Sequence, residues 1–185
     1  MSAWTLDPAH SQIEFAVKHM MITTVRGQFR KFTVDVDFDE ERPERSTVVA
    51  HIDASSIETG MEARDVHLRS ADFFDVEKYP ELTFHSTHVK AAADGYQIRG
   101  DLTIRGETRP VTLEAQIGGV VANLQGGRRA AFDATTKISR KAFGLTWNVA
   151  LESGGFLVGD DIKISIDLAV LQAEAAPEKV SATIA

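Results

Sequence analysis

The sequence predicts an all-β fold: an extended, eight-stranded antiparallel β-barrel that carries one short helical cap. Apolar and polar residues alternate with a period of two through most of the chain, which is typical of strands with one buried face. Short turns join these segments, so neighbouring strands are expected to run antiparallel. A sheet of eight or nine such strands, apolar on one side only, buries that side by closing into a barrel.

The N-terminal half of the chain carries four segments with the strand pattern. They cover residues 3–6, 12–19, 32–38 and 48–54. Phe29 and Phe32 would fall on opposite faces of one continuous strand, which predicts a bulge or bend near Arg30 and Lys31. Residues 20–22 are apolar without alternation, and we expect a short helical turn there.

Residues 60–79 form the extended stretch with a helical pattern. Thr59 and Glu62 have the spacing of a capping box, which predicts the start of the helix. One face of the expected helix is an apolar stripe of Ala63, Val66, Ser70, Phe73 and Phe74. Asp65 and Arg69 lie off this stripe with the spacing of a surface ion pair. Such a cap either plugs the end of the barrel or covers an internal cavity as a lid.

The C-terminal half returns to the strand pattern. Strands are expected at residues 82–88, 96–104, 111–117, 132–138 and 162–170. Residues 139–159 hold four glycines and no clean alternation, so we expect a long loop there. Together these elements predict a single barrel domain over residues 1–172, followed by an Ala-rich, polar C-terminal tail over residues 173–185.

Small residues occupy several inward positions of the second half. Gly100, Ala115, Ala134 and Thr136 stand where leucine or isoleucine would close the lumen. A barrel of about eight strands either fills its interior with side chains or holds one small ligand. Small residues also occur in filled barrels, so the pattern favours a cavity without excluding a packed core.

Composition excludes several classes of protein. The chain has 185 residues, no cysteine and a formal net charge of −7 at pH 7. Without cysteine there are no disulfides, thiolate metal sites or cysteine nucleophiles, and the acidic balance argues against a nucleic-acid partner. Residues 1–8 lack the pattern of a signal peptide, and no apolar run has membrane-spanning length. We therefore expect a cytoplasmic protein without a transmembrane segment.

Five motifs occur in order within residues 4–171. They are LDPAHS at residues 6–11, FAVKHM at 15–20, RDVHLRSADFFD at 64–75 with YP at 79–80, GDLTIRG at 100–106 with TRPVTL at 108–113, and SR at 139–140 with FG at 143–144. Together they resemble the motifs of the YceI-like family of lipocalin-like, polyisoprenoid-binding proteins. The resemblance implies a lipocalin-like barrel whose apolar tunnel holds a long isoprenoid-type chain. Members of the family are commonly exported, and this chain departs from them because it shows no leader.

The resemblance and the strand pattern together predict binding, storage or carriage of a long-chain apolar lipid, of polyisoprenoid or quinone type, in the tunnel. The expected wall of the tunnel is Ile13, Phe15, Val17, Phe84, Ile98, Leu102, Leu113, Phe132 and Ile138. The expected mouth and lid are His19, Met20, Arg64, Asp65, His67, Arg69, Phe73 and Phe74. Arginine suits a phosphate head through its forked donors. An ordinary core and a surface ion pair explain the same residues, and that alternative stays open.

The alternative function is a hydrolase or isomerase that acts on a lipid-like substrate in the same cavity. Six histidines are present, but His85 and His88 lie three apart on a strand and are expected on opposite faces. Neither a His-Glu-x-x-His nor a Gly-x-Ser-x-Gly motif occurs. We therefore predict no catalytic residue, no metal ligand and no cofactor, only a bound lipid. Pairing of two barrels into a homodimer, edge to edge or through the lid, stays open.

Overall fold

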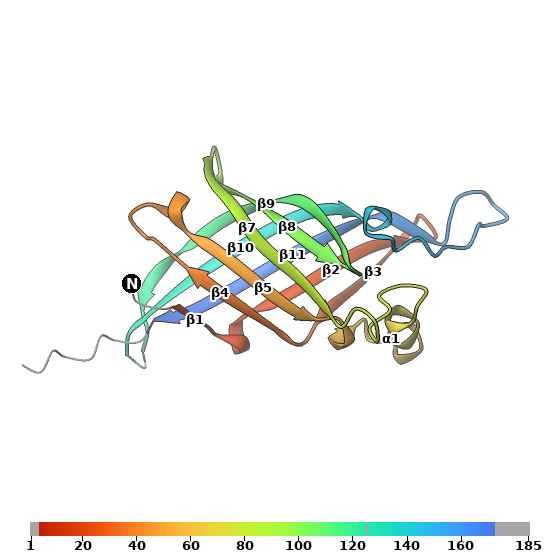
Figure 1. Ribbon diagram of the computed structural model, residues 1–185, viewed down its shortest axis with the longest axis horizontal. Helices are drawn as coiled ribbons and strands as arrows, with labels where there is room; N and C mark the ends of the chain where they lie inside the picture. The colour runs from red at the N-terminus through yellow and green to blue at the C-terminus, as the bar shows by residue number, and fades with distance from the viewer. Residues whose placement is uncertain (1–3, 125, 173–185) are drawn as a thin grey trace, which may run out of the picture.

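The computed structural model describes residues 4–124 and 126–172 and is drawn in Figure 1. The predicted tail, residues 173–185, lies outside this range. The strands are β1 (Trp4–Leu6), β2 (Gln12–His19), β3 (Thr23–Phe29), β4 (Phe32–Asp37), β5 (Thr47–Asp53), β6 (Ile57–Glu58), β7 (Glu81–Ala92), β8 (Gly95–Ile104), β9 (Glu107–Ala122), β10 (Arg128–Ser139) and β11 (Val158–Gln172). The helices in the same range are α1 (Glu62–Arg69) and the 3₁₀ segments Pro8–His10, Pro43–Arg45, Ala54–Ser56 and Arg140–Phe143.

The strands close into the eight-stranded antiparallel barrel that the alternation predicted. Strands β1 and β2 both run antiparallel to β11, so they lie along it as one interrupted strand. Strand β3 pairs with β2, and β4 pairs with β1, so β3 and β4 form a second interrupted strand. Strands β5, β7, β8, β9 and β10 complete the circle back to β11 (Figure 1).

The predicted break at Arg30 and Lys31 is confirmed. Strand β3 ends at Phe29, a bend follows at Arg30, and β4 begins at Phe32. The backbone of Lys31 stays attached to the neighbouring segment, because its carbonyl accepts the Asp53 N–H at 3.0 Å. The break reverses the inward parity, so that Phe29 and Val34 are both buried in the barrel.

The sequence did not predict β3, and the expected helical turn at residues 20–22 is wrong. These three residues form the hairpin turn between β2 and β3, with positive φ at Met20 (49°) and Met21 (64°). The alternation of β3 is hidden because its central inward position is Gly27. The ring of Phe15 covers that glycine from β2, and a Cβ built there would come within 2.4 Å of the ring.

Strand β7 contains a bulge that changes the expected positions of two histidines. The register between β7 and β8 shifts between Ser86 and His88. The extra residue restores the parity of Val89, which is buried, and leaves His85 and His88 both exposed. The expectation that these histidines lie on opposite faces is therefore wrong.

The helical cap is shorter than predicted and presents a different face to the barrel. Helix α1 ends at Arg69, and turns lead from there to β7. The expected capping box is wrong, because the N-cap residue is Met61 and it makes no side-chain capping bond. The expected apolar stripe is also wrong: Val66 is 56% exposed, whereas Asp65 is 3% exposed. Within the described residues, no helix is long and apolar enough to cross a membrane.

The two ends of the barrel are built differently. Trp4, Phe38 and Phe132 pack together at the end where β1 lies, with Phe132 set edge-on to Phe38 at 5.0 Å between ring centres. The segment around α1, residues 60–79, covers the opposite end and is called the lid (Figure 1). The interior between these ends is apolar and holds the main hydrophobic core.

Candidate functional site

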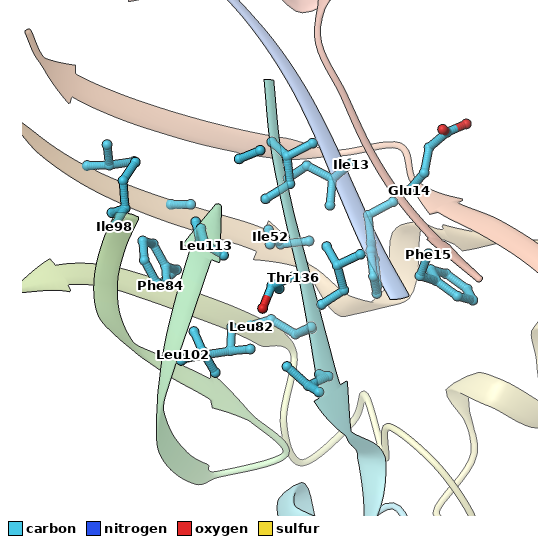
Figure 2. Close-up of a pocket in the computed structure, with 18 of the residues that line it drawn as sticks. Ile13, Glu14, Phe15, Ile52, Leu82, Phe84, Ile98, Leu102, Leu113 and Thr136 are labelled. Carbon is cyan, nitrogen blue, oxygen red and sulfur yellow. The ribbon is translucent and has the colours of Figure 1, made fainter. Parts of the chain in front are cut away.

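A cavity of about 240 Å³ runs through the interior of the barrel. Figure 2 shows side chains from opposite walls pointing into it, among them Ile13, Phe84, Leu102 and Leu113. Inward positions alternate with outward ones along each strand, so most strands of the wall contribute several apolar side chains. The arrangement suits the apolar part of a ligand.

The structure brings the predicted wall residues together. Ile13, Phe15, Val17, Phe84, Ile98, Leu102, Leu113, Phe132 and Ile138 all line the cavity. Several further residues line the cavity that were not predicted from the sequence. They include Phe29, Val34, Ala50, Ile52, Leu82, Ile104, Leu145, Ile162 and Ile164. Most of them share the inward parity of a predicted strand, and that signal would have found them.

Small residues keep part of the interior open. Ala115, Ala134 and Thr136 line the cavity. The Thr136 hydroxyl donates to the Thr112 carbonyl at 2.8 Å, so this polar group is satisfied inside the wall. Gly100 does not add free space as expected, because the ring of Phe84 lies against it and a Cβ there would come within 2.4 Å of Phe84 Cζ.

Two phenylalanines after α1 close the cavity on the lid side. Phe73 and Phe74 both line it, and Phe73 is 6% exposed. The Phe74 ring stands edge-on to Phe29 at 5.8 Å. The Phe73 ring packs against Trp147, with 5.3 Å between ring centres. The lid therefore rests on β3 on one side and on the loop after β10 on the other.

The charged residues predicted at the mouth fasten the lid to the barrel and do not line the cavity. The expected pair between Asp65 and Arg69 is replaced by other contacts. Asp65 accepts the Thr59 N–H at 2.9 Å, and Arg64 donates to the Thr59 carbonyl at 2.9 Å. Arg69 donates to the carbonyls of Ser55 and Ile57 at 2.9 and 3.0 Å.

The remaining predicted mouth residues lie at the outer edge of the lid end. The His67 ring stands between Asp72, whose carboxylate is 2.8 Å from Nε2, and Trp147, whose ring centre is 4.7 Å away. His19 ends β2, and Met20 is 46% exposed in the hairpin turn. Neither His19 nor Met20 is among the lining residues.

Arg140 is a cationic residue that also lines the cavity. It belongs to the SR motif at residues 139–140, but the sequence predicted no role for it. Its side chain is 3% exposed and donates to the carbonyls of Gly159, Trp147 and Leu145 at 2.8, 2.9 and 2.5 Å. Burial lowers the pKa of Arg140, and the nearby Asp160 carboxylate acts in the opposite direction. The guanidinium thus fixes the loop after β10 and places a positive charge at the lid end of the cavity.

Comparison with known proteins gives a consistent family match. The family described as a YceI-like domain matches residues 4–170. A UPF0312 protein of Staphylococcus aureus (strain USA300) is 38% identical over 164 residues, which cover 88% of this chain and 94% of the relative.

Solved structures with the same fold come from several bacteria. Burkholderia cenocepacia BcnA superposes with a TM-score of 0.76 at 27% identity, over 89% of this chain and 98% of that one. A Campylobacter jejuni YCEI protein gives 0.72 at 31% identity, over 85% and 90%. A polyisoprenoid binding domain from Saccharophagus degradans gives 0.61 over 93% and 99%, and at 15% identity this likeness concerns the fold alone.

Proposed function

The chain belongs to the YceI-like family, and from its lid-covered apolar cavity we propose that it binds the chain of a long apolar lipid, of polyisoprenoid or quinone type, inside the barrel. The observation that carries the proposal is the cavity itself, which is continuous along the barrel and walled by isoleucine, leucine, valine and phenylalanine. The solved domain from Saccharophagus degradans, whose description names polyisoprenoid binding, has the same fold and adds support.

The size of the cavity favours a slender ligand. Pockets for drug-sized molecules measure about 300–1,000 Å³, and this cavity measures about 240 Å³. A single linear hydrocarbon chain fits such a narrow space, whereas a fused ring system does not fit it. Each buried CH₂ group contributes about 0.8 kcal/mol, so about ten of them supply the free energy of micromolar binding before ordering costs are subtracted.

The ends of the barrel suggest how the ligand is oriented. The Trp4, Phe38 and Phe132 rings cluster at the β1 end, whereas the lid end carries Arg140 and the separate lid segment. We place the polar head of the ligand at the lid end and the tail toward the aromatic end. This orientation lets the head keep contact with water and with the cation.

Binding without catalysis agrees best with the contacts of two polar lining residues, Thr136 and Arg140. The Thr136 hydroxyl is engaged with a backbone carbonyl, and the Arg140 donors are directed at carbonyls. Neither is arranged as a nucleophile beside a base. The hydrolase or isomerase alternative would need such a pair next to the ligand chain.

Extraction of the purified protein with organic solvent, followed by mass spectrometry, tests the proposal. We expect a long-chain lipid at a ratio approaching one per protein, and we expect the delipidated protein to take up an isoprenoid alcohol. Absence of both would overturn the proposal. Turnover of a long-chain ester by the same preparation would support the enzyme instead.

A further inference from the structure

An exposed apolar tip projects from the barrel at the lid end. This tip consists of the β2–β3 turn, with Met20, Met21 and Ile22, and of Val149 and Phe156 in the loop between β10 and β11. The five side chains are 46%, 67%, 78%, 46% and 54% exposed, in that order. In Figure 1 the loop between β10 and β11 projects beyond the strands at the end where α1 lies.

The two parts of the tip form one surface. The Met20 N–H donates to the Leu157 carbonyl at 2.8 Å, which joins the turn to the loop. The Met21 sulfur lies against Gly155, where a Cβ would come within 2.3 Å of it. His19, the last residue before the turn, pairs with Val158, and Val158 lines the cavity. The tip is thus directly beyond the lid end of the ligand cavity.

The turn keeps apolar side chains where the backbone disfavours them. Met20 and Met21 both have positive φ, a conformation that side chains other than glycine and asparagine rarely adopt. A hairpin turn normally carries glycine, asparagine or aspartate at such positions. Two strained and exposed methionines followed by an exposed isoleucine therefore point to a function for their apolar surface.

The charge around the tip indicates what covers it. Residues 142–159 contain one charged side chain, Glu152, although a quarter of the whole chain is charged. Two cations flank the apolar surface: the Lys141 ammonium lies 5.7 Å from the centre of the Phe156 ring, and Lys18 bonds Thr24 beside the turn. Apolar side chains flanked by two lysines match the layered chemistry of a phospholipid surface, with hydrocarbon inside and phosphate outside.

A second copy of the chain fits this surface less well. Five partly exposed side chains on a projecting tip present at most a few hundred Å², below the roughly 800 Å² per partner of a stable protein interface. We propose that the tip inserts into the surface of a phospholipid bilayer and holds the lid end of the barrel against it. This docking is independent of the identity of the ligand in the cavity.

Partition of the full chain to phosphatidylcholine vesicles tests the proposal. Met21→Ser with Ile22→Ser should weaken vesicle binding at least tenfold, because two inserted apolar side chains are lost. Val121→Ser with Leu124→Ser is the matched control. These residues are 61% and 104% exposed, Val121 near the end of β9 and Leu124 in the turn that follows, at the other end of the barrel, so binding should stay unchanged. High salt should change binding only slightly, since insertion is apolar.

A second measurement locates the tip within the lipid. Brominated phosphatidylcholine should quench the emission that Ile22→Trp adds to that of the native Trp4 and Trp147, and it should not quench the emission that Leu124→Trp adds. The proposal is overturned if the native chain does not bind these vesicles, or if the tip and control variants bind equally. It is also overturned if the tip variant only loses self-association in light scattering, which would identify a second copy as the partner.

Discussion

Single residues decide how the interior of this barrel is filled. Gly27 and Gly100 each receive a phenylalanine ring from the neighbouring strand, from Phe15 and Phe84 respectively. The rings replace the side chains that the glycines lack, so large aromatics lie flat along the wall and leave the centre open. A sequence pattern shows an inward phenylalanine, but it does not show which glycine its ring covers.

Asp65 is the residue whose loss should most weaken the lid. Its buried carboxylate accepts the Thr59 N–H, and Asp65→Ala leaves that donor unpaired inside the protein. We expect a loss of about 1–3 kcal/mol of unfolding free energy, measured by denaturant titration. Asp72→Ala removes a 52% exposed carboxylate from the same segment and should cost much less. Equal losses in the two variants would mean that the Thr59 contact contributes little.

Asp133 should make stability depend on pH. It faces Asp167 across β10 and β11, and its pKa is raised above 3.8 by burial first, then by hydrogen bonding with Asp167 and by repulsion from it. The folded state therefore binds the proton more tightly than the unfolded state. The stability contribution of Asp133 is largest below pH 3.8 and falls as the pH rises through the folded-state pKa.

Asp133→Asn should accordingly raise the melting temperature at pH 7 and give no gain at low pH. Like charges directly opposite on two strands cost about 0.2–1 kcal/mol, and a domain of this size shifts by about 2–4 °C for each kcal/mol. Thermal melts at pH 7 and pH 3 check this, with Asp94→Asn in the exposed β7–β8 turn as the control. A gain that is the same at both pH values would contradict the assignment.

Strands could be predicted from the sequence where their inward positions are apolar. A strand was missed where an inward position is not apolar. Residues 32–38 alternate strictly, and β4 lies there. Strand β3 was missed because Gly27 interrupts its apolar face. The helical segment was found, but its buried face was wrong, since amphipathic analysis assigns apolar residues to the inside and Asp65 is buried by hydrogen bonds. The polar contacts of the lid join α1 to backbone groups of residues 55–59, which lie before the helix, and the periodicity of the helix does not encode them.

The lid should contribute to ligand binding through Phe74. Its ring lines the cavity and is partly buried against Phe29, so Phe74→Ala removes apolar contact with the ligand chain. Burial of such a side chain is worth about 1.5–3 kcal/mol, and affinity should fall by roughly ten- to a hundredfold. Titration of delipidated protein with an isoprenoid alcohol, well below the melting temperature, measures this.

Val66→Ala is the control, since Val66 is exposed on α1 and does not line the cavity. If the segment after α1 only plugs the end of the barrel, Phe74→Ala should give a different result. The melting temperature should fall, and the protein that stays folded should bind the ligand with unchanged affinity. That outcome would show that the segment after α1 closes the barrel without contacting the ligand.

The two ends of the barrel differ: aromatic rings pack together at one end, and a separate lid lies at the other. Trp4 and Phe132 belong to strands β1 and β10, and Phe38 directly follows β4, so moving these rings apart would disturb strand pairing. The lid is attached mainly through side-chain hydrogen bonds and ring contacts, which can break while the sheet stays intact. Exchange of a ligand is therefore expected at the lid end, beside the apolar tip proposed to contact lipid.

The open interior of the barrel should accept larger side chains. Ala115 and Ala134 face each other as neighbours on β9 and β10, and both line the cavity. Ala115→Leu with Ala134→Leu fills space that is empty in the folded protein, so unfolding free energy should stay the same or rise by about 0.5–2 kcal/mol. Ligand affinity should fall more than tenfold, because the added side chains occupy the path of the ligand chain.

Ala131→Leu, at an exposed position of β10, is the control and should leave affinity unchanged. If the filled barrel is strongly destabilised, the interior is a tightly packed core; if it stays folded and binds lipid as before, the chain does not pass between β9 and β10.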